Sequence, residues 1–135
     1  MNKAVINILL FCSFSIPFPF LAMYQDKFYR IAVGYAIMLA ALYIISTIAK
    51  LLTDSSLTIM LTGNIMSAIV SWYSLSIVID EKNSTWAHYF KPFTPMQCLM
   101  IICVLNLVPQ LQARQVVKWY QNRKKKLSSQ VETTS

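Results

Sequence analysis

The side chains that most often carry catalysis are few in this sequence, and their spacing brings no catalytic set together. His88 is the only histidine, and no Ser, His and Asp residues are grouped around it. Cys12, Cys98 and Cys103 all lie in long apolar stretches, where a thiol mostly acts as a small hydrophobic group. They lack the close spacing of zinc ligands, and three cysteines give no disulfide framework. We therefore expect no enzymatic activity, no metal site and no cofactor.

Small residues within the apolar stretches have a different use, the close packing of helices. Gly63, Ser67 and Ser71 recur every four residues, which places them on one face of a helix. Small side chains let another helix backbone approach closely inside a membrane. A second stripe of this kind lies near Gly34 and consists of Ala32, Ala36 and Ala40.

Three amide side chains also fall within apolar stretches: Asn7, Asn64 and Asn106. An amide in hydrocarbon seeks a hydrogen-bond partner across helices, which is worth roughly 0.6 to 2 kcal/mol. Together with Gly63, Ser67 and Ser71, these amides are our candidates for helix packing or partner binding. Two interpretations stay open, because such faces either hold the chain's own helices together or form an exposed seam for another protein or a second copy.

A basic run near the end of the chain, "NRKKK" at residues 122–126, is the strongest concentration of charge. The apolar residues before it recur at helical spacing, so residues 113–127 are expected to form a basic amphipathic helix at the membrane surface. It either binds anionic lipids or is a solvated run that only sets the topology. We expect no nucleic-acid binding, since no separate folded module accompanies the run. The surface candidates are Arg114, Lys118, Trp119, Arg123, Lys124, Lys125 and Lys126.

The longest polar connection, residues 80–95, is rich in aromatic side chains. Its aromatic residues either lie at the membrane interface as a belt or present a recognition surface on the outer side. The recognition candidates are Trp86, His88, Tyr89 and Phe90.

The distribution of charge predicts the elements that must position these groups. Residues 4–25, 31–49, 55–79 and 92–113 contain no Asp, Glu, Lys or Arg. A bilayer core about 30 Å thick needs about 20 helical residues to cross it, whereas a soluble helix needs only one apolar face. We therefore predict an all-α integral membrane protein. Its four transmembrane helices run over about 4–23, 31–49, 57–79 and 95–112 and form one domain, 1–112, followed by the basic helix and a disordered tail, 128–135.

Prolines and caps predict where these helices break and begin. Pro17 and Pro19 each remove a backbone donor, so the first helix should kink or unwind within residues 15–20. The pattern for signal-peptide cleavage around this segment is poor, and we expect the segment to be retained. Thr94 and Pro95 match the start of a helix, with a capping box completed by a glutamine. Pro109 should either kink the fourth helix or end it early.

Orientation follows from the basic residues. With four crossings, the side that holds both termini collects eight Lys and Arg residues and the other side four. The positive-inside rule then places both termini in the cytoplasm and the protein in the plasma, or inner, membrane. This assignment depends on the basic residues of 114–126.

Taken together, these features predict a non-catalytic multi-pass membrane protein that acts through helix contacts with another membrane protein, as a regulator, an accessory subunit or an immunity-type blocker. The alternative is a small transporter or channel assembled from copies of this chain. Four short spans with both ends inside and a basic tail resemble the architecture of small inner-membrane proteins, including the immunity proteins that protect against pore-forming bacteriocins. The likeness is one of architecture, since no motif carries it.

Overall fold

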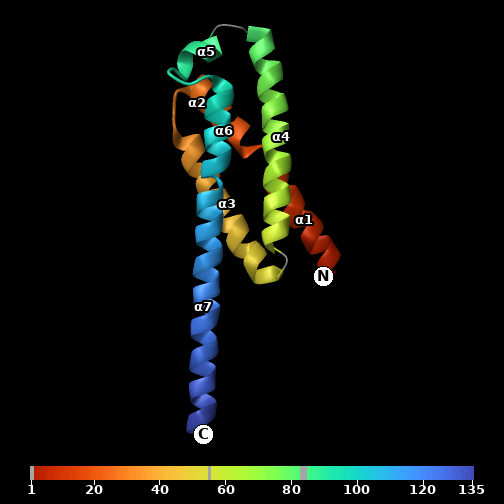
Figure 1. The fold of residues 1–135 in the computed structure, drawn as a ribbon, viewed down its shortest axis with the longest axis vertical. Helices are drawn as coiled ribbons and strands as arrows, with labels where there is room; N and C mark the ends of the chain where they lie inside the picture. Colours follow the sequence, from red (N-terminus) through yellow and green to blue (C-terminus); the bar gives the residue numbers. More distant parts are fainter. Residues whose placement is uncertain (1, 55, 83–84) are drawn as a thin grey trace.

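The computed structural model of the chain describes residues 2–54, 56–82 and 85–135, and within these ranges it is helical without any strand. Figure 1 shows the helices as an elongated bundle from which one long helix projects. In chain order they are α1 (Lys3–Ser15), α2 (Phe18–Tyr29), α3 (Val33–Leu52), α4 (Ser56–Lys82), α5 (Thr85–Tyr89), α6 (Pro95–Leu105) and α7 (Leu107–Thr134).

Four helical segments are long and apolar enough to cross a membrane, as the sequence predicts. The first combines α1 with α2, and the fourth combines α6 with α7. The path runs up, down, up and down, so both chain ends lie toward the lower end of the bundle in Figure 1. The segments are Lys3–Tyr29, Val33–Leu52, Leu57–Ile79 and Pro95–Thr134.

The expected break in the first span is confirmed. α1 ends at Ser15, α2 begins at Phe18, and Pro17 and Pro19 flank the junction. At the break the Ile16 carbonyl accepts from the Phe18 N–H at 2.7 Å. The Ser67 hydroxyl of α4 donates to that carbonyl oxygen at 2.7 Å. A neighbouring helix thus adds a second hydrogen bond to a backbone carbonyl at the break, as suits an apolar environment.

The start of the fourth span also follows the sequence. The Thr94 hydroxyl accepts from the Gln97 backbone N–H at 3.3 Å, and the Gln97 side chain accepts from the Thr94 N–H at 3.0 Å. This reciprocal pair is the predicted capping box. It satisfies two donors that a helix start would otherwise leave without partners.

The end of that span differs from the prediction. The helix is interrupted at Asn106, one turn before Pro109, and then continues as α7 to Thr134. Pro109 has no N–H for the carbonyl of Leu105 and its ring crowds that carbonyl, so the interruption falls there. The structure therefore makes residues 113–127 a direct continuation of the span. It also extends the helix through the tail 128–135, which was expected to be disordered, and the Ser128 hydroxyl donates to the Lys124 carbonyl within it.

Apolar residues pack into two clusters along the bundle. The first joins α1, α2, α3 and α4 and contains Leu10, Phe14, Ala22, Met38, Leu42, Ala49 and Met60. The second lies toward the end that carries α5 and contains Met23, Leu75, Trp86 and Leu99. Many other large apolar side chains face outward along the spans, as expected of helices whose outer surface meets lipid.

Candidate functional site

The small-residue face of α4 lies inside the bundle. Gly63, Ser67 and Ser71 are buried, and α4 packs along α1. A Cβ added at Gly63 would overlap the Cβ of Phe14, so glycine is required for this close approach. These residues therefore hold the chain's own helices together, the first of the two interpretations that the sequence left open.

The second predicted stripe, which consists of alanines near Gly34, faces the outside of the bundle. Ala36 and Ala40 are exposed on the outside of α3, while the helix buries the side that contains Gly34. A Cβ at Gly34 would come within 2.5 Å of the Gln25 Oε1 atom of α2. The small side chains of the alanine stripe thus face outward and only the glycine is used for internal packing.

A reciprocal amide pair joins α4 to α7. The Asn64 amide nitrogen donates to Gln110 Oε1 at 2.7 Å, and the Gln110 amide nitrogen donates to Asn64 Oδ1 at 3.0 Å. Asn64 also donates to the Met60 carbonyl at 2.7 Å. Gln110 is fully buried. Gln110 is not among the residues predicted from the sequence, although it is an amide inside a charge-free stretch like Asn7, Asn64 and Asn106.

Beside this pair, the outer surface of the bundle is hollowed into an open groove of about 310 Å³ between α4 and the α6–α7 junction. Asn64 is the one polar residue in its lining. Ile65 and Val104, which are 60% and 66% exposed, stand on opposite walls. The lining residues are Leu61, Asn64, Ile65, Ala68, Cys103, Val104 and Leu107. The groove has the shape and apolar character that would receive side chains of another helix in the membrane.

The other two predicted amides occur at separate places. Asn7 borders a cavity of about 390 Å³ at the end of α1 together with Lys3 and Asp54. Asn106 is buried at the α6–α7 interruption. Among the described residues, four buried side-chain oxygens make no hydrogen bond, and they belong to Asn7, Ser46, Ser71 and Asn106.

The aromatic loop residues pack onto the end of the bundle. Trp86 is only 2% exposed and stacks with Phe90 at a centroid distance of 6.0 Å. Tyr24 and Phe28 of α2 also contact the Trp86 ring. The position of Trp86 matches neither an interfacial belt nor a recognition surface, because its large ring fills space between helices. Of the four recognition candidates, His88 and Tyr89 are exposed and Phe90 is half-buried.

Asp26 ties this loop to the bundle. Its Oδ1 accepts from the Tyr89 hydroxyl at 2.9 Å, and its Oδ2 accepts from the Tyr35 hydroxyl at 3.1 Å. One carboxylate thereby joins α2, α3 and α5. The hydrogen bond to Asp26 raises the pKa of Tyr89 above its ordinary value, with desolvation and the negative charge of Asp26 acting in the same direction. Tyr89 is therefore an anchor of the loop.

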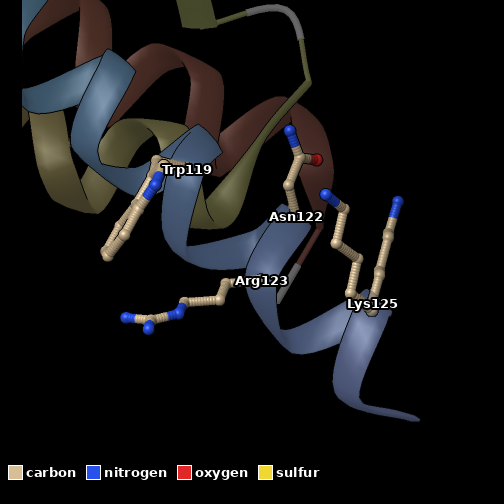
Figure 2. A pocket seen from close by; sticks show the side chains of 5 residues that line it. Trp119, Asn122, Arg123 and Lys125 are labelled. Carbon is tan, nitrogen blue, oxygen red and sulfur yellow. The ribbon is translucent and has the colours of Figure 1, made fainter. Parts of the chain in front are cut away.

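Of the predicted surface residues on α7, Arg114 directly follows Ala113 and is half-buried, and the other six form two groups farther along the helix. At about 1.5 Å per residue, Lys118 and Trp119 lie about 8 to 9 Å beyond Ala113, and Arg123 to Lys126 lie about 15 to 20 Å beyond it. Figure 2 shows Trp119 and Arg123 on one side of α7, with Asn122 and Lys125 on the other. The Arg123 guanidinium lies 5.0 Å from the centre of the Trp119 ring. Because α7 continues the span, its far part projects from the bundle and does not lie across its end.

Comparisons with protein-family models, with curated proteins and with solved structures give no match. Across the described ranges, no three His, Cys, Asp or Glu side chains lie close enough together to hold a metal ion.

Proposed function

We propose that this chain is a non-catalytic multi-pass membrane protein that acts by binding another membrane protein, as a regulator, an accessory subunit or an immunity-type blocker. The observation that carries the proposal is the apolar groove between α4 and the α6–α7 junction. A groove in the outer surface of the spans leaves room that a partner helix can fill more closely than lipid chains. Close packing of this kind is the main source of helix association in a bilayer.

The amide pair at the groove supports the same proposal. Asn64 lines the groove and is held by Gln110, so it presents a fixed polar group at the base of an apolar surface. A carbonyl oxygen of this amide has capacity for a second hydrogen bond. A partner helix with a serine, threonine or amide at this depth would gain both apolar contact and one directed polar contact.

The test is to fill the groove from its exposed wall. Val104→Trp and Ala68→Leu place larger side chains in the space that the partner helix would occupy. The matched control is Ile37→Trp on α3, whose native side chain is 58% exposed outside the groove. We expect mass spectrometry of mild-detergent extracts to find a second protein in stoichiometric amount with the wild type and with Ile37→Trp, and at least tenfold less of it with the groove variants.

Equal recovery of the second protein with all variants, or its absence from the wild-type particle, would overturn the proposal. Substitution of Gly63 or Ser67 by leucine, which the sequence alone would suggest, is not a clean test. Both residues are buried against α1, so these changes would disturb the bundle before any partner is lost.

For orientation and membrane contact, we propose a plasma, or inner, membrane location with both termini in the cytoplasm. The support is the excess of Lys and Arg on the side of the two termini. On that side Lys118 and Trp119 lie within reach of the headgroup layer. Anionic lipids would attract the lysine, and the interface is the favoured location for an indole ring.

A second candidate, a transporter or channel, is favoured by one observation. Among the residues whose burial the structure describes, five polar side chains are buried within the apolar segments: Ser46, Ser67, Ser71, Asn106 and Gln110. Polar groups inside a membrane protein often mark a path for a solute. Solute or ion flux into liposomes that contain only this protein would favour the transporter. A flux equal to that of empty liposomes would argue against the transporter and favour the binding function.

A further inference from the structure

The bundle leaves most of the projecting part of α7 uncovered, and of its described residues Asp54 alone borders a hollow beside it together with Gln121 and Lys124. From Lys118 to Ser135, every side chain except Gln121 is exposed. Figure 1 shows this length of helix running past the ends of α1 and α3 with no other helix beside it. A helix with several Ser and Thr residues and no neighbour is marginally stable in water, and a partner that packs along it would stabilise it.

One stripe of α7 passes from the buried part of the helix into the exposed part. Its members recur at alternating intervals of three and four residues, the spacing of the seam in a two-stranded coiled coil. The first three are buried in the bundle, and the apolar residues beyond them, Tyr120, Leu127 and Val131, are 62%, 60% and 69% exposed. The full series is Gln110, Ala113, Val117, Tyr120, Lys124, Leu127 and Val131. The packing face thus continues beyond the helices that cover it.

The charges on this helix decide what can cover the exposed stripe. Residues 114–134 carry six Lys and Arg residues against one acidic residue, Glu132. Lys124 lies within the stripe and Arg123 lies beside it. Two copies of the chain in one membrane run parallel, so a self-dimer along this stripe would place Lys124 against Lys124. Like charges at a seam are destabilising, whereas a carboxylate opposite each of them is favourable.

A bilayer covers this stripe less well than an acidic helix. The headgroup region adds only about 5 to 8 Å on each side of the hydrocarbon core. Arg123 to Lys126 lie about 15 to 20 Å beyond Ala113 along a straight helix. At physiological salt, electrostatic attraction fades over about 8 Å. With Ala113 at the edge of the hydrocarbon core, where the predicted fourth span ends, the apolar positions Leu127 and Val131 lie about 21 and 27 Å along the helix, beyond the headgroup region.

We propose that residues 120–131 of α7 dock an acidic amphipathic helix of another protein, with apolar contacts at Tyr120, Leu127 and Val131 and a carboxylate facing Lys124. This surface is separate from the groove between α4 and α6–α7, and the proposal does not rest on that groove.

The experiment uses the full chain in nanodiscs of neutral phosphatidylcholine. The probe is a fluorescent peptide with leucine at seam positions and glutamate at the flanking positions and opposite Lys124. A scrambled peptide of the same composition has equal charge but no seam. We expect the probe to bind the wild type at least tenfold more tightly than the scrambled peptide. Leu127→Gln should weaken probe binding at least tenfold, and Asn122→Gln, on the opposite side of α7, should leave it unchanged.

Three results would overturn the proposal. Equal binding of the probe and the scrambled peptide would show attraction by charge alone. A stable self-dimer that Leu127→Gln abolishes would identify a second copy as the occupant. Protection of residues 120–131 from hydrogen exchange in nanodiscs with anionic lipid, together with no probe binding in neutral nanodiscs, would identify the bilayer. Val104→Trp should bind the probe like the wild type, which separates this proposal from failure of the groove.

Discussion

At the scale of single residues, the polar side chains inside the spans act through specific partners. Ser67 donates to the Ile16 carbonyl at the break in the first apolar segment, and Gly63 makes room for Phe14. Asn64 and Gln110 satisfy one another across two helices. In an apolar medium each such group is costly when its partner is removed, so pairs of substitutions are more informative than single ones.

The amide pair gives the first residue-level prediction. Asn64→Leu leaves the buried Gln110 amide without its partner and should lower the free energy of unfolding by about 1 to 2 kcal/mol. The double variant Asn64→Leu with Gln110→Leu removes both amides and should recover at least half of that loss. Thermal unfolding in detergent, followed by circular dichroism, measures both values. A double variant less stable than the sum of the single losses would contradict a paired role.

At the scale of elements, short helix α5 and the loop around it are fastened to the bundle by one carboxylate and one large ring. Asp26 of α2 accepts from Tyr35 of α3 and from Tyr89 of α5, and Trp86 is inserted into the second apolar cluster. The anchor from Tyr89 requires a protonated phenol, because only its O–H can donate to the carboxylate. The attachment of α5 should therefore depend on pH.

The sign of this dependence follows from the raised pKa of Tyr89. The stabilisation is fully present below the ordinary phenol value of about 10 and is lost as pH rises through the higher value in the folded protein. The tyrosinate absorbance of the wild type minus that of Tyr89→Phe should titrate above pH 10, and hydrogen exchange in α5 should increase over the same range. Asp26→Asn should return the titration toward about 10. A difference curve centred at or below that value would refute the anchor.

At the scale of the whole molecule, four apolar helical segments alternate in direction and bring both chain ends to one end of the bundle, and α7 extends beyond it on that side. The molecule therefore has two separate surfaces, the apolar groove between α4 and the α6–α7 junction and the projecting basic part of α7. In the proposed membrane arrangement these two surfaces lie at different depths, so one partner would engage both only with a membrane-spanning part and an acidic helix outside the bilayer.

The orientation of the molecule is predicted to depend on the basic run of α7. Replacing Arg123, Lys124, Lys125 and Lys126 by glutamine lowers the count on the side of the termini from eight to four, equal to the other side. Tags at both ends should be accessible only from the cytoplasm in the wild type and from both sides in the glutamine variant. Exchanging lysine and arginine at these four positions keeps the charge and should keep the orientation. Uniform cytoplasmic tags in the glutamine variant would refute this role.

Short-range features of the amino-acid sequence predict much of the architecture. The four charge-free stretches predict the four apolar helical segments, the prolines predict the break between α1 and α2, and Thr94 with Gln97 predicts the start of α6. Each of these follows from backbone donors, ring geometry or the thickness of a bilayer, which act over a few residues or one helix.

Which face of each helix points into the bundle follows from the tertiary structure and not from the sequence pattern. The alanine stripe of α3 faces outward while Gly34 packs, Asn64 pairs with Gln110, and Trp86 is buried. In a soluble helix the contrast between polar and apolar faces would indicate these directions. Inside a membrane, lipid and the protein interior are both apolar. The inner and outer faces of a helix therefore differ little in residue type, and the sequence does not indicate which face is buried. Packing against particular neighbours selects the inner face, and the same packing leaves the far part of α7 without a helix beside it.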